Sequence, residues 1–144
     1  MTTSTPYMLF TDGGARGNPG PAGIGYSLQD GETEVLFGSE YINQATNNTA
    51  EYQALITALS HINRSELKIK HLECKLDSQL VVMQILGKYK VKQPHLQQLL
   101  VKVKQQLEQL KQSGCQISIS HIPRNQNKRA DQLVNQAIDA SIRK

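Results

Sequence analysis

The stretch LFTDGGARGNPGPAGIG, residues 9–25, joins a strand-like run to a segment rich in glycine and proline, and its only acidic residue is Asp12. We expect a strand over residues 7–11 and, after it, a glycine-rich loop that leads into a second strand over residues 24–28. Because an Asp-Gly pair is a common turn former, Asp12 has two interpretations. It belongs either to a turn or to a site that residues far along the chain complete.

The segment that follows predicts an antiparallel meander. A third strand is expected over residues 34–42, and the Asp30-Gly31 pair before it is a strong hairpin signal. After these strands, apolar residues at Tyr52, Leu55 and Leu59 recur with the spacing of one helix face. The pattern therefore changes from strands to a helix within residues 43–64.

The rest of the chain alternates between strand and helix patterns. Ser78 is suited to cap the N-terminus of a short helix, and Pro94 is suited to begin a long one. The remaining expected elements are a strand over His71–Leu76, helices over residues 79–86 and 94–113, a strand over residues 115–122 and a helix from about Lys128.

This order of elements predicts an α/β fold. A hairpin meander followed by strands with helical crossovers favours a mixed five-stranded sheet, in which strands 1, 2 and 3 are antiparallel and strands 1, 4 and 5 are parallel. Helices flank this sheet. We expect a polar tail over residues 1–6 and one domain over residues 7–144, because 144 residues can bury a sufficient core without disulfides.

Composition and charge limit the class of protein. The chain has 38% hydrophobic residues and no apolar run as long as a membrane span, so we expect a cytoplasmic protein. Nothing in the sequence demands more than a monomer, and we expect no obligatory protein partner. Cys74 and Cys115 are expected to be buried free thiols, since reducing compartments keep thiols apart. A net charge of +4 favours a polyanionic partner, although the clustered basic residues also fit a solvated surface.

Four acidic residues occur near the ends of expected elements. Asp12 follows the first strand and Asp77 follows the fourth, so parallel pairing of these strands would bring both to one edge of the sheet. Glu51 is expected in the first turn of the first helix and Asp131 near the start of the last, each beside an apolar face. We therefore expect both to lean toward the sheet.

Each acid also has a purely local interpretation. Asp12 can form a turn, Glu51 can complete a capping box with Asn48, Asp77 can begin a helix, and Asp131 can complement a helix dipole. Gathered together, however, carboxylates repel one another and raise one another's pKa unless a cation neutralises them. Oxygen ligands of this kind suit Mg²⁺ or Mn²⁺.

The motifs TDGGARGNPGPAGIG, TNNTAEYQAL, LDSQLV and NKRADQLVNQA resemble those of the type 1 ribonuclease H family, in the same order, over about residues 7–138. The short segment after residue 87 resembles the subset that lacks a basic protrusion. The resemblance implies an endonuclease that cuts the RNA strand of RNA/DNA hybrids and leaves 5′-phosphate and 3′-hydroxyl ends. It also implies that Asp12, Glu51, Asp77 and Asp131 hold two Mg²⁺ or Mn²⁺ ions, with Asp12 bridging both.

The resemblance further implies a set of substrate contacts. A bare backbone at Gly13 and Gly14 would let the minor groove of the hybrid come close. Helix capping by the asparagines and ordinary surface polarity are the local alternatives for the polar residues. The other implied contacts are Asn18, Asn47, Asn48, Gln79, Lys88 and Lys90, and the lysines would make binding sensitive to salt.

Many members of this family carry a functional residue in a flexible loop before the last helix. His121 has a compatible spacing from Asp131, but it also fits the last residue of a strand. Arg124 lies in the expected loop, and we favour it for this role. The alternatives to a ribonuclease H are a nuclease of the same fold that acts on double-stranded RNA or another duplex, and a hybrid-binding module without catalysis.

Overall fold

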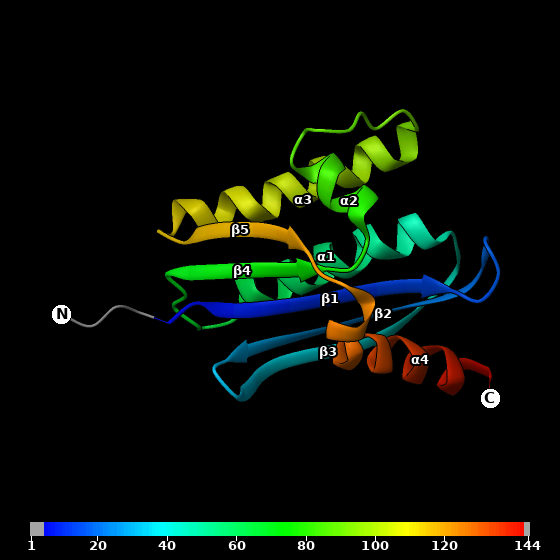
Figure 1. The fold of residues 1–144 in the computed structure, drawn as a ribbon, viewed down its shortest axis with the longest axis horizontal. Helices are drawn as coiled ribbons and strands as arrows, with labels where there is room; N and C mark the ends of the chain where they lie inside the picture. The colour runs from blue at the N-terminus through cyan, green and yellow to red at the C-terminus, as the bar shows by residue number, and fades with distance from the viewer. Residues whose placement is uncertain (1–4, 143–144) are drawn as a thin grey trace.

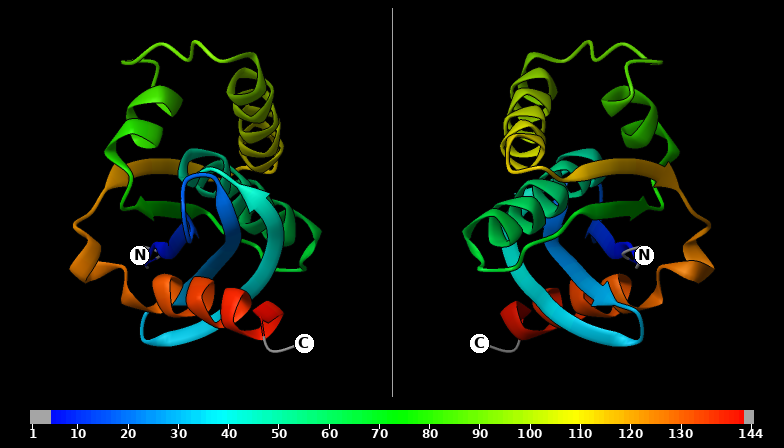
Figure 2. Two further views of the ribbon diagram at one scale, coloured as in Figure 1. Left: turned by 90° about the vertical axis from the view of Figure 1, so that its right-hand side faces the viewer. Right: turned by 90° about the vertical axis from the view of Figure 1, so that its left-hand side faces the viewer.

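The structure is a computed structural model and describes residues 5–142, which form one mixed five-stranded sheet with helices on both faces (Figures 1 and 2). The predicted tail over residues 1–6 lies largely outside the described residues. In chain order the elements are β1 (Tyr7–Ala15), β2 (Gly20–Asp30), β3 (Thr33–Ala45), α1 (Asn47–Arg64), β4 (His71–Leu76), α2 (Gln79–Ile85), α3 (Pro94–Gln112), β5 (Gln116–His121), the 3₁₀ turn η1 (Arg124–Gln126) and α4 (Lys128–Ile142).

The strand order confirms the predicted fold. The order is β3-β2-β1-β4-β5, with β1–β2 and β2–β3 antiparallel and β1–β4 and β4–β5 parallel. Helices α1, α2 and α3 cover one face of the sheet, and α4 covers the other (Figure 2). Between α2 and α3 the chain makes a short connection without a helix of its own, as expected for the subset without a protrusion.

The predicted glycine loop is wrong in its extent. Strand β1 continues to Ala15 and β2 begins at Gly20, so only residues 16–19 form the turn. Asp12 pairs with Gly25 in this antiparallel ladder and therefore lies inside β1. The parallel ladder with β4 is shorter, because it stops at the pair Thr11 and Leu76.

These glycines lie in strands because two helices pack directly on them. A Cβ atom on Gly13 would lie 2.1 Å from the carbonyl oxygen of Ala50 in α1. A Cβ atom on Gly25 would lie 2.4 Å from the carbonyl oxygen of Ala130 in α4. The two glycines thus let α1 and α4 approach the sheet backbone from opposite faces. Both glycines adjoin Asp12, since Gly13 follows it in β1 and Gly25 pairs with it in β2.

The main core lies between the sheet and the helices α1, α2 and α3. Cys74 and Cys115 are buried in this part of the molecule and are free, as predicted. None of the helices within residues 5–142 is both long and apolar enough to cross a bilayer.

Candidate metal centre

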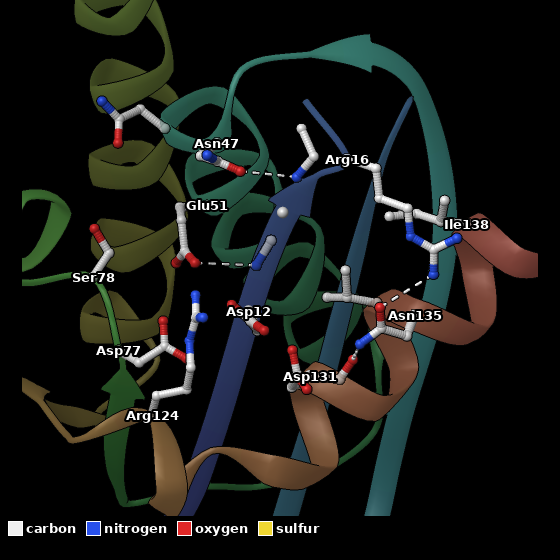
Figure 3. Close-up of a pocket in the computed structure, with 15 residues that line it drawn as sticks. Asp12, Arg16, Asn47, Glu51, Asp77, Ser78, Arg124, Asp131, Asn135 and Ile138 are labelled. Atoms are coloured by element: carbon white, nitrogen blue, oxygen red, sulfur yellow. Dashed lines mark hydrogen bonds between the residues drawn. The ribbon is translucent and has the colours of Figure 1, made fainter. Parts of the chain in front are cut away.

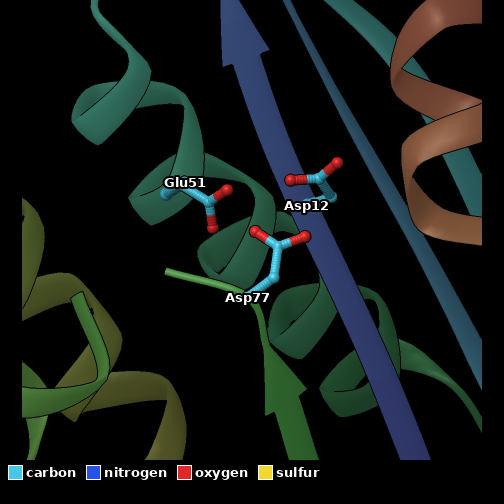
Figure 4. Close-up of side chains that lie close together, drawn as sticks. All are labelled: Asp12, Glu51 and Asp77. Carbon is cyan, nitrogen blue, oxygen red and sulfur yellow. The ribbon is translucent and has the colours of Figure 1, made fainter. Parts of the chain in front are cut away.

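Three carboxylates converge at the edge of the sheet. Asp12, Glu51 and Asp77 each offer an oxygen, and these oxygens lie within 4.8 Å of one another (Figure 4). Asp12 and Asp77 directly follow the last pair of the parallel β1–β4 ladder, so the register alone places them side by side. The prediction that the two aspartates share an edge is confirmed, although β1 itself continues beyond Asp12.

Glu51 reaches the cluster from helix α1. The helix is capped by Thr46, whose hydroxyl accepts a hydrogen bond from the Thr49 N–H at 3.2 Å. Glu51 is therefore in the second turn, and the expected first-turn position and the capping box with Asn48 are both wrong. The close packing of α1 on Gly13 lets the Gly13 N–H donate to Glu51 Oε1 at 3.3 Å.

The carboxylates are held in an unfavourable electrostatic environment. Asp12 and Glu51 are each only 5% exposed. Burial raises the pKa of Asp12 to about 7, and the charges of Asp77 and Asp131 act in the same direction. Burial also raises the pKa of Glu51 well above its usual range, and the negative charge of Asp12 is the next largest cause that raises it. A nearby cation would relieve this repulsion.

The residues present fit a divalent cation. Glu51 Oε2 is buried and has no hydrogen-bond partner in the described structure, which is rare for a charged oxygen in a folded protein. The donors of the cluster are three carboxylates, and hard oxygen ligands of this kind are typical of Mg²⁺ and Mn²⁺ sites.

Asp131 differs from the other three predicted acids. It lies in the first turn of α4, as expected, and lines the same cleft of about 380 Å³. It is half-buried and lies outside the cluster of three oxygen donors. The predicted set of four acids is thus three clustered carboxylates with a fourth on the rim (Figure 3).

The two candidate loop residues occupy different places. Arg124 lies in η1 and lines the cleft, and its side chain extends toward the carboxylates in Figure 3. Its positive charge lowers the pKa of Asp12, against the larger effect of burial. His121 is the last residue of β5, is exposed, and is not among the residues that line the cleft.

The predicted substrate contacts are divided between the cleft and its surroundings. Gly13, Gly14, Asn47 and Asn48 line the cleft. Asn47 does not cap the helix with its side chain, because its Oδ1 accepts from the Ala15 N–H at 2.9 Å. The residues that lie outside the cleft lining are Asn18, whose Oδ1 accepts from the Asn47 N–H at 3.0 Å, and the exposed Gln79, Lys88 and Lys90.

Sequence reasoning missed several residues of the cleft. Asn135 and Ile138 line it, and they follow Asp131 at intervals of four and seven residues. This spacing puts all three on one helix face, which is a signal the sequence does contain. Arg16 also lines the cleft and makes an ion pair with Asp139 at 2.7 Å, a contact that no local pattern indicates.

The chain is similar to known proteins over most of its length. Residues 10–137 match the family described as reverse transcriptase-like. The chain is 39% identical over 131 residues to ribonuclease HI of Halobacterium salinarum, covering 90% of this chain and 63% of that protein. It is also 39% identical over 136 residues to a bifunctional protein of Mycobacterium tuberculosis, covering 93% of this chain but only 36% of that protein.

A solved structure is similar over nearly its full length. The crystal structure of LC11-RNase H1 in complex with an RNA/DNA hybrid superposes with a TM-score of 0.86 at 42% identity. The match covers 94% of this chain and 99% of that chain. The similarity therefore includes the whole sheet and all the helices around the candidate site.

Proposed function

This chain belongs to the type 1 ribonuclease H branch of the reverse transcriptase-like family, and on that basis we propose that it is an endoribonuclease acting on the RNA strand of RNA/DNA hybrids. Hydrolysis would leave 5′-phosphate and 3′-hydroxyl ends. The observation that carries the proposal is the cluster of Asp12, Glu51 and Asp77, in which two of the carboxylates are buried, the charges repel one another and Glu51 Oε2 has no hydrogen-bond partner in the described structure. A protein that only binds polyanions gains nothing from such a cluster.

The proposed cofactor is a pair of Mg²⁺ or Mn²⁺ ions. The pKa of Asp12 responds to all three of the other acids, so Asp12 would contact both ions, while Asp131 would contribute from the rim. When bound, such a pair activates a water molecule and stabilises the leaving 3′-oxygen in phosphodiester hydrolysis. The role of the protein is to fix these oxygen ligands on β1, on α1, which packs closely on β1, and at the end of β4, which pairs with β1.

Arg124 is proposed to assist turnover in place of His121. It brings a positive charge close to Asp12, whose pKa it lowers, whereas Arg16, the other arginine that lines the cleft, is paired with Asp139. Its position in the short turn η1, before α4, leaves the side chain free to approach the product phosphate. His121 is the exposed last residue of a strand and is not among the residues that line the cleft.

The substrate contacts follow from the shape of the cleft. Backbone groups of Gly13 and Gly14, with Asn47 and Asn48, would face the shallow minor groove in which RNA shows its 2′-hydroxyls. Asn18 would support Asn47, with which it is hydrogen-bonded. Gln79, Lys88 and Lys90 lie beyond the cleft and would contact the backbone of the hybrid, so affinity should fall as salt is raised.

We also propose that the protein acts as a cytoplasmic monomer without an obligatory protein partner. All the carboxylates of the site come from one chain. The two buried free thiols fit a reducing compartment, in which disulfides rarely form.

The test is cleavage of a labelled RNA/DNA hybrid by the purified protein with Mg²⁺ or Mn²⁺. Double-stranded RNA and double-stranded DNA of the same sequence are assayed beside it, and Asp77→Asn is the inactive control. Cleavage of the hybrid RNA alone, lost in Asp77→Asn, supports the proposal. Preference for another duplex would assign a different substrate to the same fold, and binding without cleavage would indicate a hybrid-binding module.

A further inference from the structure

A buried asparagine links the elements that carry the acidic residues. Asn127 lies between η1 and α4 and is only 1% exposed. Its side-chain amide donates to the carbonyl oxygen of Thr11 at 2.8 Å and to Asp77 Oδ2 at 3.0 Å. The main-chain carbonyl oxygen of Asn127 accepts a hydrogen bond from the Asp131 N–H at 3.1 Å.

This arrangement departs from what an asparagine at the start of a helix usually does. Asparagine is favoured directly before a helix because its side-chain oxygen accepts from the first free N–H groups. In Asn127 the side chain turns inward, and its Oδ1 is buried without a hydrogen-bond partner in the described structure. The side chain therefore does not cap the helix. It donates to Thr11 in β1 and to Asp77, while its Oδ1 has no hydrogen-bond partner in the described structure.

The contacts of Asn127 reach three of the four acids. Thr11 is the residue before Asp12, Asp77 is contacted directly, and Asp131 is hydrogen-bonded through the backbone. Fixing one oxygen of Asp77 fixes the plane of the whole carboxylate, and with it the direction of the other oxygen. An amide can do this without adding charge, whereas an aspartate at the same place would repel Asp77.

We propose that Asn127 is a positioning residue for the metal centre. It orients Asp77 toward Asp12 and Glu51, and it holds the first turn of α4 so that Asp131 stays at the rim of the cluster. This inference rests on the proposed metal-dependent function. Groups that hold a metal ligand from behind contribute to metal affinity because they fix its orientation before the ion arrives.

The test compares Asn127→Ser with Asn125→Ser, an exposed asparagine in the same segment. Serine is nearly as good as asparagine before a helix, so α4 should still begin at the same residue. It is too short to reach Asp77. Three quantities are measured for each variant: thermal unfolding without metal, Mn²⁺ affinity by calorimetry without nucleic acid, and kcat and KM on the hybrid.

We expect Asn127→Ser to bind Mn²⁺ about 10- to 100-fold more weakly than the unaltered protein. Its kcat should fall while KM for the hybrid changes little, and a raised Mn²⁺ concentration should restore part of kcat. Asn125→Ser should match the unaltered protein in all three quantities. Rescue of kcat by metal in a variant whose metal-free thermal unfolding matches that of Asn125→Ser is the result that a general loss of stability would not produce.

Equal Mn²⁺ affinity and equal kcat in Asn127→Ser and Asn125→Ser would overturn the inference and leave the proposed nuclease intact. If the unaltered protein itself neither binds Mn²⁺ nor cleaves the hybrid, the metal centre and this inference both fall. Should Asn127→Ser fail to fold, Asn127→Asp keeps the shape and the capping preference but lacks the donor. An unchanged kcat in that variant would likewise overturn the role of Asn127.

Discussion

Helices α1 and α4 both pack on the sheet through a glycine, but they bring their acids into different surroundings. In α1, Glu51 is buried, contacts the Gly13 N–H and belongs to the cluster of three carboxylates. In α4, Asp131 is half-buried and stays on the rim. The α1 side therefore carries most of the electrostatic strain that a cation relieves, and the α4 side is open to solvent and substrate.

The contacts that hold the two helices differ as well. Helix α1 lies between the sheet and α3 in the main core. Helix α4 adds polar links to its apolar face, with Arg129 paired to Glu34 at 2.9 Å and the Ser39 hydroxyl donating to the Leu133 carbonyl oxygen. Glu51 therefore lies on a helix that the main core holds, whereas Asp131 lies on a helix that polar contacts also hold.

The largest expected effect separates the two acids directly. Glu51→Gln should lower the rate of hybrid cleavage by at least about a thousandfold, because metal ligands supply several kcal/mol of transition-state stabilisation. Asp131→Asn should lower it less, by about 10- to 100-fold. Single-turnover cleavage rates at saturating Mg²⁺ measure both. Equal losses would show that the rim position of Asp131 does not persist when substrate is bound.

Glycine substitutions test the packing that brings the helices close. Gly13→Ala should destabilise the fold by about 3 kcal/mol or more, since the new Cβ would meet backbone atoms of α1 that cannot move aside cheaply. Gly14→Ala is the matched control, because the nearest atom to its Cβ is a Val134 methyl carbon at 3.8 Å. Urea unfolding gives both free energies. A small effect at Gly13 would contradict the close approach of α1.

The metal-free protein should lose stability as pH rises from about 4 to about 7. The pKa of Asp12 is raised from 3.8 to about 7 in the folded state, so the folded chain holds a proton in this range that the unfolded chain has released. The expected loss is on the order of a few kcal/mol. It is measured by urea unfolding with a chelator present.

Two variations check the source of this pH effect. Asp12→Asn should flatten the pH dependence, because it removes the carboxyl group whose raised pKa produces it. Saturating Mg²⁺ should stabilise the protein more at the upper end of the range than at the lower end, where protons compete with the ion. A stability that rises with pH in the metal-free protein would contradict the raised pKa of Asp12.

The smallest expected effect concerns the segment before α4. Arg124→Ala should slow turnover by about tenfold, which corresponds to about 1.4 kcal/mol, while affinity for the hybrid stays nearly unchanged. His121→Ala should have little effect on either quantity. Steady-state rates and binding to the hybrid in an Asp77→Asn background test this pair. A large loss of affinity in Arg124→Ala would make Arg124 a phosphate anchor instead.

Several features of the molecule could be predicted from local sequence. The spacing of apolar residues indicated the helices and strands, and the order of elements predicted the parallel pairing that sets Asp12 beside Asp77. These predictions held because side-chain periodicity and turn chemistry are properties of short segments.

The division of the four acids into three and one was decided by tertiary packing. It depends on how far α1 and α4 descend onto Gly13 and Gly25, which in turn depends on contacts between segments that are distant in sequence. The inward turn of Asn127 has the same origin, because the pattern before α4 fits a helix cap equally well. A sequence pattern specifies which face of an element is apolar, but only packing fixes the distances between elements, and the chemistry of this site depends on those distances.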